Sequence, residues 1–476
     1  MSMFSYFKPI STALLPNAEL DDIKIVLKLF LPWNWSKWQE GKEIGELENK
    51  FKEYFGVKHA ISFSSGRAGL YAILKSLILQ YPISNIQYPE VIAQAFTTIA
   101  IPNAIKQAGF KTVYIDIKED TYNIDPDKIE EKITANTKAI IVQHTFGVPA
   151  EMDKILAFCK KHNLLLIEDC AHSLGAEFGG KKAGTFGGAA FFSFGRDKII
   201  SSTSGGMVIT SDNVLADEIK KFQSILEFPS KKWILQQLAH PLVFWFSLPI
   251  YYFFNIGKLK IFLAQKLGII SRAYSEAEKK GIGNMRGYRL PNALAVLALN
   301  QFKKLERFNN HRRKIAEIYD KSFHYDNMNY HSGIDIGKTD KNSFYYHTLE
   351  YDSRVNNVKN EQKISHFGNW DNQSEIKLPL NIQKNKSVFL YYTIQVERRD
   401  ELLKFAAKKH IILGDWFPGA LGPKGVNEEK FGYKKGACPI AERVGLKSLN
   451  LPTNIRTSEK DAKKVADLIK KFLNKK

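Results

Sequence analysis

The chain has 476 residues, of which 44% are hydrophobic and 25% are charged, so it is too long for one ordinary core and too apolar for a disordered chain. Its three cysteines are too few for a disulfide framework and match no metal-site spacing, which predicts a reducing compartment and no bound metal. The formal net charge of +20 would attract phosphates, nucleic acid or an anionic membrane. Alternatively, it reflects lysines at every solvated position. Zinc-finger, RNP and basic-zipper patterns are absent, which argues against nucleic acid.

The first part of the chain has the alternating pattern of an α/β fold. Its N-terminus shows no basic stretch that leads into an apolar run, so we expect no secretory signal. AISFSS (60–65) predicts a strand that leads into a helix at Gly66, and three further runs have the length of buried strands: TVYIDI (112–117), AIIVQHTF (139–146) and LLLIED (164–169). MDKILAFCKKHN, between the last two, predicts an amphipathic helix. This rhythm predicts a mostly parallel sheet with helices on both faces, in which ligands bind at the carboxyl ends of the strands.

One segment does not fit this pattern. Residues 233–257 form a run of 25 residues without a charge, with lysines on both flanks. Its length would allow a membrane span, but Pro241 and Pro249 are expected to break a continuous helix. Two interpretations remain: a buried helical hairpin or dimer contact, and an interfacial segment that lies on a membrane with its lysines at the headgroups. IVLKLFLPWNWSKW, near the N-terminus, would then be a second contact.

The later part of the chain changes character. Residues 283–325 carry one long helical pattern that would link two domains, 326–386 are polar and suggest loops and short strands, and the tail mixes strands with helices. We therefore predict a large domain over 1–223, an apolar insertion over 224–282, and a linking helix with a small α+β domain over 283–476.

Three groups in this frame match the needs of pyridoxal 5′-phosphate (PLP), a cofactor that itself supplies the electron sink. Such a site needs a lysine amine for a Schiff base, a carboxylate for the pyridine nitrogen and a helix N-terminus for the phosphate. Lys198 follows a strand-like run, Asp169 ends LLLIED, and SSGRAGL (64–70) forms a strand-to-helix turn. Each signal alone also fits a solvated lysine, a helix cap or an ordinary turn, but their order along one chain favours the cofactor site.

Eight stretches carry a more specific signal: SSGRAGLYAIL, AFTTIAIPNAI, YIDIKEDTYNIDPDKIEEKI, KAIIVQHTFGVPAEMD, IEDCAHSLGAEFGGKKAGTFGGAAFFSFGRDK, SGGMVIT, GYRLPNALAVLALNQFKKLERFNNHRRKIAEIYD and CPIAERVGLKSLNLPTNIRTSEKDAKKVADLIKKF. In this order they resemble consecutive blocks of the DegT/DnrJ/StrS family of sugar aminotransferases. Together they cover most of the chain outside 224–282 and 326–386. The resemblance implies a fold-type-I PLP-transferase, with a mostly parallel large domain and a smaller α+β C-terminal domain.

The resemblance also implies a role for each candidate residue. Lys198 would carry PLP as a Schiff base and then move the proton between substrate and cofactor, and Asp169 would hold the pyridine nitrogen. Arg67 replaces the usual threonine and would pair with the phosphate directly. The remaining implied contacts are with the ring and the phosphate: Gly66, Ala171, His172 and Ser193. The family further implies a homodimer whose active sites use both chains.

Several positions depart from the family pattern. Thr98 stands where the family has an aromatic residue stacked on the ring, and Phe96 is the nearest aromatic in sequence. The acidic residue usually found before Gly-Gly is Ser204, and an asparagine expected from the partner chain is Gly287. A histidine of the substrate loop is replaced in DWFPGALGP by Trp416. The surroundings of the substrate are thus more altered than those of the cofactor.

The sequence therefore predicts a PLP-dependent aminotransferase that converts the keto group of a nucleotide- or lipid-linked sugar to an amino group, with glutamate as donor. One rival is the dehydratase branch of the family, which has a histidine in place of Lys198. The other is a non-catalytic protein of the same fold that acts as a membrane-surface partner or scaffold, which Thr98 and Ser204 would favour. The expected location is the cytoplasm, with a peripheral contact to the inner face of the membrane.

Overall fold

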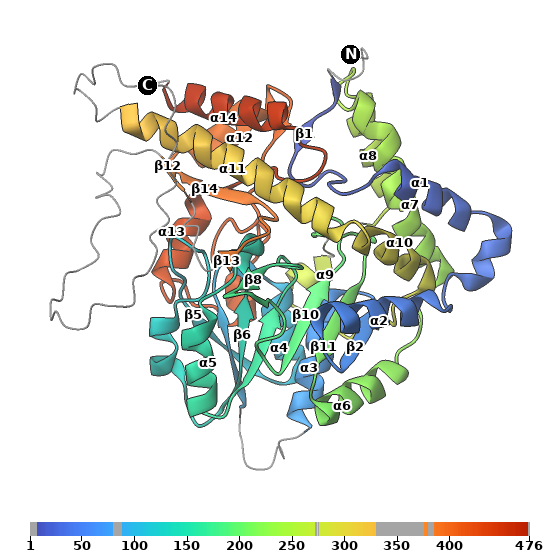
Figure 1. The fold of residues 1–476 in the computed structure, drawn as a ribbon, viewed down its shortest axis with the longest axis vertical. Helices are drawn as coiled ribbons and strands as arrows, with labels where there is room; N and C mark the ends of the chain where they lie inside the picture. The colour runs from blue at the N-terminus through green and yellow to red at the C-terminus, as the bar shows by residue number, and fades with distance from the viewer. Residues whose placement is uncertain are drawn as a thin grey trace, which may run out of the picture.

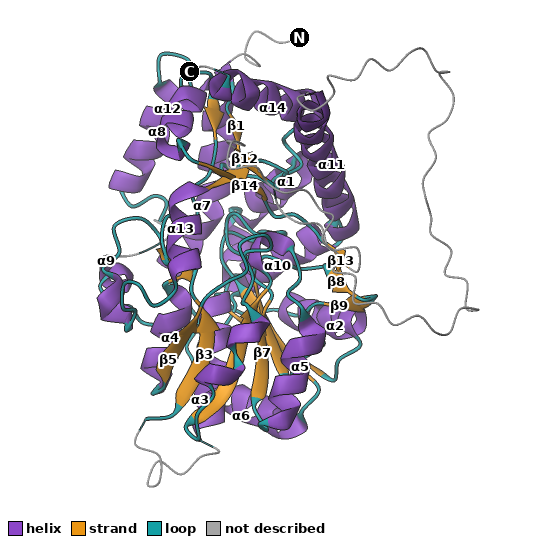
Figure 2. Cartoon of the chain, turned by 90° about the vertical axis from the view of Figure 1, so that its left-hand side faces the viewer, coloured by secondary structure: helices purple, strands orange, loops and turns teal. Residues whose placement is uncertain are grey.

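The computed structural model has a central seven-stranded sheet with helices on both faces (Figures 1 and 2). In spatial order the strands are β2 (His59–Phe63), β11 (Gly206–Thr210), β10 (Ala189–Ser193), β7 (Leu165–Asp169), β6 (Thr137–Gln143), β3 (Glu90–Gln94) and β5 (Lys111–Ile115). β11 runs antiparallel to β2 and β10, and the other pairings are parallel. The predicted mostly parallel α/β sheet and its four predicted strands are thereby confirmed.

The structure describes the following residues: 7–79, 88–271, 274, 276–329, 376–378 and 385–474. The prediction of loops and short strands over 326–386 lies mostly outside them. Within that range, β12 (Ile376–Lys377) and β13 (Asn385–Lys386) are short strands.

The two faces of the sheet carry alternate side chains of each strand, as the pleat requires. Val91 and Ala93 of β3 face one way, into a core shared with three helices: α3 (Gly66–Ile78), α4 (Ala100–Ala108) and α6 (Asn213–Ser224). Ile92 faces the other way, where the sheet is covered by α2 (Glu43–Phe55), α5 (Met152–Lys161) and α10 (Asn292–Phe302). Helices on both faces leave the carboxyl ends of the strands as the open edge of the sheet.

The single long helix predicted over 283–325 is in fact two helices. α10 ends at Phe302 and α11 (Leu305–Asn329) begins after a turn at Lys303 and Lys304. The Nζ of Lys304, in this turn, lies 2.9 Å from a carboxylate oxygen of Asp21 and 2.8 Å from one of Asp22. These ion pairs connect the turn to the start of α1 (Leu20–Leu29). The apolar pattern continues across this turn, which is why periodicity does not show it.

A second core lies in the C-terminal part of the chain. β14 (Tyr392–Val396) pairs with β12 and with β17 (Ser448–Leu451), and this small sheet packs against α11, α12 (Arg399–Ala407) and α14 (Glu459–Leu473). This agrees with the α+β pattern of the tail, while the domain limits at 223 and 282 stay a prediction.

The remaining elements are short: β1 (Ile10–Ser11), η2 (Pro32–Lys37), β4 (Thr97–Thr98), η4 (Pro126–Lys128), η5 (Glu130–Lys132), η6 (Thr145–Gly147), β8 (Glu177–Phe178), β9 (Lys181–Lys182), α9 (Glu276–Lys279), β15 (Ile411–Ile412), β16 (Leu421–Gly422), η8 (Glu428–Phe431) and α13 (Pro439–Lys447).

The apolar insertion folds as a helical hairpin. α7 (Lys231–Ser247) leads through η7 (Leu248–Ile250) to α8 (Ile256–Lys266), which packs back on α7, and α1 also packs on α7. The expectation that both prolines interrupt the helix is wrong for Pro241, which lies inside α7. Pro241 cannot donate to the carbonyl four residues earlier, but its neighbours His240 and Phe244 are buried, so packing offsets the lost hydrogen bond. Within the described residues, no helix combines the length and the apolar composition that a membrane crossing requires.

Candidate active site

The candidate residues meet at one edge of the large sheet. Asp169 is the last residue of β7 and Ser193 the last of β10, and these two strands are parallel neighbours. β2 runs in the same direction, because β11 is antiparallel to both β2 and β10, and it leads into α3 at Gly66. The loop after β10 carries Lys198. The sheet topology therefore brings together groups that lie far apart in sequence.

Asp169 is a buried carboxyl group with few polar neighbours. Its Oδ1 accepts a 3.0 Å hydrogen bond from the N–H of Ala171. Burial raises the pKa of Asp169 to about 6, although the Ala171 N–H, Lys198 and His144 all favour the charged form. A carboxylate in this position is stabilised by any further cationic group that approaches it.

Lys198 lies between an acid and an aromatic ring. Its Nζ is 3.7 Å from Oδ2 of Asp197 and 5.3 Å from the centroid of the Trp416 ring. Tyr391 stacks on Trp416 at a centroid distance of 5.7 Å and donates its hydroxyl to Asp197. Trp416, predicted only as a replacement in the substrate loop, thus lies beside the lysine.

The backbone of Lys198 is held by residues that have no signal in the sequence. Asn17 donates to the carbonyl oxygens of Lys198 and Ile199, the latter at 3.1 Å. Arg312, buried, donates to Oδ1 of Asn17 at 2.6 Å and to the carbonyl of Ile199 at 3.2 Å. Burial lowers the pKa of Arg312 to about 9. These contacts fix the loop that carries the lysine from two segments that are far apart in sequence, the turn before α1 and the helix α11.

His172 packs against two phenylalanines that also contact each other. Its ring lies 5.7 Å from Phe146 and 6.1 Å from Phe417, stacked on both, and its Nδ1 accepts from the N–H of Phe146. Burial, and then the charge of Lys198, lower the pKa of His172 well below its ordinary value. The imidazole is therefore neutral near pH 7, and Ala171 beside it is half-buried.

The start of α3, here called the anion cradle after its predicted role, lies close to Ser193. Ser65 caps the helix by accepting from the N–H of Ala68 at 3.3 Å. A Cβ at Gly66 would lie 3.0 Å from the Phe192 carbonyl and 3.0 Å from the Cβ of Ser193, so only glycine lets the helix start approach Ser193 so closely. The first N–H groups of a helix favour negative charge, and the Ser193 hydroxyl adds a donor beside them.

Two arginines add positive charge to this region. Arg67 forms an ion pair with Glu278 of α9. The pKa of Arg196 is lowered to about 10, chiefly by burial; Asp197 opposes this shift and Arg67 contributes to it. Arg67 therefore does not lie free at the helix start, and its predicted contact with a phosphate stays a prediction. Two guanidinium groups that repel each other would both be stabilised by an anion between them.

The departures from the family pattern have local structural roles. The hydroxyl of Ser204 donates to the carbonyl of Ser64 at 2.7 Å and so joins the loop after Lys198 to the turn before α3. Gly287 has φ +69°, and a Cβ there would lie 2.5 Å from the Cβ of Ala68. The Thr98 and Tyr274 hydroxyls are 2.8 Å apart. Tyr274 and Glu278 had no predicted role, because both lie at the end of the predicted insertion (224–282) and belong to no recognisable motif.

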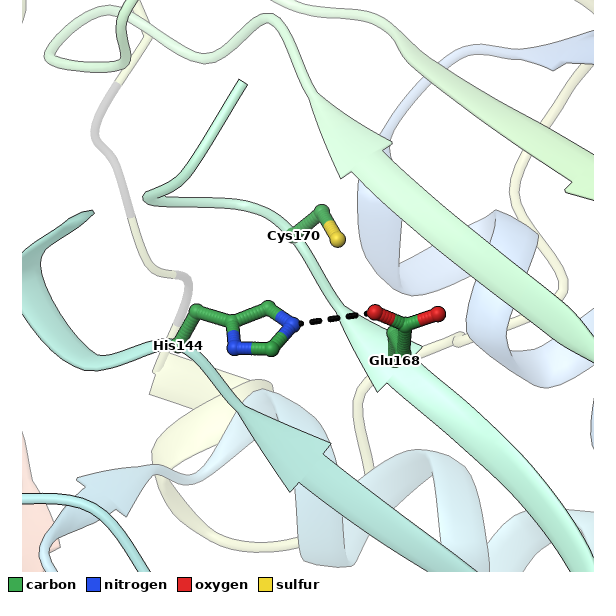
Figure 3. Close-up of side chains that lie close together, drawn as sticks. All are labelled: His144, Glu168 and Cys170. Atoms are coloured by element: carbon green, nitrogen blue, oxygen red, sulfur yellow. Dashed lines mark hydrogen bonds and ion pairs between the residues drawn. The ribbon is translucent and has the colours of Figure 1, made fainter. Parts of the chain in front are cut away.

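One further cluster lies next to Asp169. Among the described residues, His144, Glu168 and Cys170 come close enough to hold a metal ion, and Figure 3 shows the imidazole pointing at the carboxylate. His144 accepts from the Ala150 N–H through Nδ1 and lies 3.1 Å from Glu168 through Nε2. Three backbone N–H groups also donate to this carboxylate, from Gly184, Phe186 and Gly187. Because these groups are already hydrogen-bonded, the cluster braces a loop against β7 and is not assigned as a metal site.

Comparisons with known proteins agree with this arrangement. The sequence profile of the DegT/DnrJ/EryC1/StrS aminotransferase family matches residues 27–232, 259–369 and 364–470. The chain is 31% identical to a GDP-perosamine synthase of Escherichia coli O157:H7 over 60% of this chain and 65% of that protein, just under two thirds of its length. It is 30% identical to a UDP-4-amino-4,6-dideoxy-N-acetyl-beta-L-altrosamine transaminase of Campylobacter jejuni, over 64% of this chain and 67% of that protein.

The fold has close counterparts among solved structures. Helicobacter pylori PseC, an aminotransferase involved in the biosynthesis of pseudoaminic acid, superposes with a TM-score of 0.67 over 98% of this chain and 99% of that one, at 22% identity. The likeness extends over almost the whole length of both chains and shows that they share a fold.

Proposed function

Because the chain belongs to the DegT/DnrJ/EryC1/StrS aminotransferase family, we propose that it is a PLP-dependent enzyme that converts the keto group of a nucleotide-linked sugar to an amino group. The observation that carries this proposal is the buried Asp169 carboxyl, with its pKa raised to about 6, at the sheet edge that also bears Lys198. A buried carboxylate is costly unless a cationic partner completes the site, and a protonated ring nitrogen would be such a partner.

The residues present fit PLP. Asp169 would hold the pyridine nitrogen, and the glycine-lined start of α3 with Ser193 would hold the phosphate. His172 would lie beside the ring as a neutral imidazole, so it would not repel a protonated pyridine. Ala171 is small enough to let a flat ring approach the end of β7, and Arg67 would add a charge-assisted contact to the phosphate.

Bound PLP would supply the electron sink for negative charge at the reacting carbon. Asp169 would keep the ring nitrogen protonated, which makes that sink effective. Lys198 would hold the cofactor covalently and act as the base and acid that moves a proton at the reacting carbon. Asp197 and Trp416 flank the amine and limit its positions, and the Asn17 contact fixes the backbone beneath it.

We propose glutamate as the amino donor, since an anionic donor suits the positive charge of Arg67 and Arg196. The nucleotide carrier is supported by the names of the two relatives, a GDP-perosamine synthase and a transaminase of a UDP-linked amino sugar. A homodimer is the proposed assembly. Two exposed apolar residues next to the Arg67 region, Ile225 at 64% and Ile282 at 74%, support a second chain at this edge.

A peripheral membrane contact is also part of the proposal, through the exposed parts of 233–257 and the helix that follows. Ile234, Leu238 and Phe244 of α7 are buried, whereas Phe246 and Phe254 are exposed at 58% and 84%. Four further exposed apolar side chains lie on α8 and the turn after it, here called the α8 face: Leu259, Phe262, Leu263 and Leu267. Their spacing of three, four and eight residues places them on one side of a helix.

Charge supports an anionic lipid surface as the occupant of the α8 face. Lys258, Lys260 and Lys266 lie on the same helix, and each lysine near anionic headgroups would add about 1 kcal/mol. Trp33 and Trp35 in η2, which follows α1, are exposed at 70% and 46% and are residue types that favour a membrane interface.

Liposome flotation tests the α8 face. We expect the full chain to float with anionic vesicles, and the double variant Leu259→Ser/Phe262→Ser to remain in the soluble fraction. Val214→Ser/Leu446→Ser is the matched control, because these residues are equally exposed, at 67% and 64%, on other helices. Equal flotation of both double variants contradicts the proposal. A stable oligomer that Leu259→Ser/Phe262→Ser dissociates, without flotation of the parent, would assign the α8 face to a second copy.

The activity itself is tested by spectroscopy and turnover. Purified protein supplied with PLP should absorb visible light, and borohydride reduction should attach the cofactor to the peptide that contains Lys198. Glutamate with a GDP- or UDP-linked keto sugar should then yield the amino sugar and the 2-oxo acid. A protein that takes up no PLP, or that is labelled at another lysine, contradicts the proposal and favours a non-catalytic role.

A further inference from the structure

The segment that follows the α7–α8 hairpin contacts the candidate cofactor site. We call it the strap and define it as residues 271, 274 and 276–285. At its start, Arg196 donates to the carbonyl oxygen of Ser271 at 2.7 Å and to its hydroxyl at 2.6 Å. Arg196 is two residues before Lys198, so the strap begins beside the loop of the lysine.

The strap next contacts β4 at Thr98 and the start of α3 at Arg67. The Tyr274 hydroxyl is 2.8 Å from the hydroxyl of Thr98, and Glu278 forms the ion pair with Arg67 at the start of α3. Arg67 and Tyr274 are close enough for the tyrosine to influence the arginine electrostatically. Tyr274 therefore lies between the end of β4 and the anion cradle of α3.

The end of the strap is fixed on α4, the helix that begins two residues after Thr98. Asn103 donates to the carbonyl of Glu278 at 3.1 Å. Gln107 donates to the carbonyl of Gly283 and accepts from the N–H of Met285 at 3.2 Å. With anchors at both ends, the position of Tyr274 follows from the fold of its own chain.

Thr98 has no aromatic ring to pack on a cofactor, and Tyr274 lies beside it. A threonine offers no flat surface to a cofactor ring, and Phe96, the nearest aromatic in sequence, is fully buried against Tyr122 and Phe417. Tyr274 is only partly buried and packs at the border of the main core. Its hydroxyl bond to Thr98 brings an aromatic ring to the position where the side chain at 98 ends.

From this geometry, and resting on the proposed function, we propose that Tyr274 supplies the aromatic side chain that packs on the PLP ring in place of one at position 98. The strap is the element that positions it. The contact is predominantly with the tyrosine ring, and the hydroxyl bond to Thr98 orients that ring.

PLP titration of the apoprotein tests this assignment by affinity as well as by the absorbance maximum of the bound cofactor. Loss of a stacked aromatic should weaken PLP binding by roughly tenfold. We therefore expect Tyr274→Ala to bind PLP more weakly and with a shifted maximum, and Tyr274→Phe to stay close to the parent. Tyr274→Ala/Thr98→Tyr, which restores an aromatic at position 98, should recover most of the affinity.

Tyr88→Ala is the matched control, since Tyr88 is 69% exposed and lies at the amino end of β3, away from the carboxyl ends of the strands that carry the candidate site. Thermal unfolding of each apoprotein shows whether the variants remain folded. Unchanged affinity in a folded Tyr274→Ala, or failure of Thr98→Tyr to rescue it, overturns the assignment while the parent still binds PLP. A parent protein that binds no PLP overturns the proposed function and the assignment together.

Discussion

The two sides of the candidate cofactor site are built in different ways. On the sheet side, Asp169 and Ser193 end neighbouring parallel strands, and Lys198 follows in the next loop. On the strap side, Tyr274 and Glu278 reach the site from the end of the insertion and are held by side-chain contacts. Groups with a unique chemical task lie on the sheet side, whereas groups that only need to provide surface or charge lie on the strap side. Variants on the sheet side should therefore change turnover, and variants on the strap side should change affinity.

The largest effect is expected at Lys198. Lys198→Ala removes the amine that would bind the cofactor covalently, so the visible absorbance of the lysine-bound cofactor should disappear. Turnover should fall by at least ~10⁴-fold, which corresponds to roughly 5.5 kcal/mol of transition-state stabilisation. Steady-state kinetics and an absorbance spectrum measure both, with the exposed Lys435→Ala as control. A variant that retains even a tenth of the parent turnover would remove Lys198 from the reaction.

Asp169→Asn should be the next most severe change. The ring nitrogen would lose its ionic partner while the shape of the side chain is conserved, so turnover should fall by about 10³-fold, or about 4 kcal/mol. PLP should still be bound, because the phosphate cradle and Lys198 remain. Near-parental turnover at saturating PLP would mean that Asp169 is only a structural cap.

The same residue should make the apoprotein sensitive to pH in the opposite sense from a salt-bridged acid. The folded pKa of Asp169 is about 6 and the unfolded value about 3.8, so the folded state holds its proton more tightly. As pH rises from below 3.8 to above 6, the apoprotein should lose on the order of 3 kcal/mol of stability from this group, most of it between pH 4 and 6. Denaturant unfolding of parent and Asp169→Asn apoproteins at pH 4 and 7 measures the difference. If that difference does not vary with pH, the Asp169 carboxyl is not perturbed in the folded apoprotein.

The smallest effect is expected where the two sides meet, at Arg67 of α3, which pairs with Glu278 of the strap. Arg67→Ala should weaken PLP binding by about tenfold, because one charge-assisted contact to the phosphate is lost, and should leave turnover at saturating PLP nearly unchanged. Glu278→Gln provides the comparison, since it leaves Arg67 in place but removes its anionic partner. Unchanged PLP affinity in Arg67→Ala would mean that the arginine contacts the substrate instead of the phosphate. A fall in turnover without a fall in affinity would contradict the expected difference between the two sides.

The sheet side could be predicted from the sequence because its signals are local. Each strand appears as a short aliphatic run, and Asp169 and Gly66 occur at fixed places relative to the ends of such runs. The break between α10 and α11 could not be predicted, because the apolar period continues across Lys303 and the ion pairs that accompany the turn come from α1. The prediction at Pro241 was wrong for a different reason. The local rule that proline breaks a helix predicted a break there, but burial of the surrounding side chains holds the helix together.

The strap side and the supports of Lys198 could not be predicted for the opposite reason. Asn17 and Arg312 contact the Lys198 loop across separations of 181 and 113 residues, and an asparagine or arginine at those positions has no distinguishing neighbours. Tyr274 follows a segment whose hydrophobicity suggested a membrane or a buried hairpin, so its place at Thr98 depends on the tertiary path of that segment. Such contacts depend on how whole elements pack.

Gly287 constrains how this sequence can change over time. An asparagine at 287 would tolerate the positive φ of +69°, but its Cβ would lie only 2.5 Å from the Cβ of Ala68, at the first turn of α3, and would collide with it. A side chain at 287 therefore needs more room beside α3, which Ala68→Gly would provide by removing the methyl group that it meets. That change alone would cost about 1 kcal/mol of helix stability.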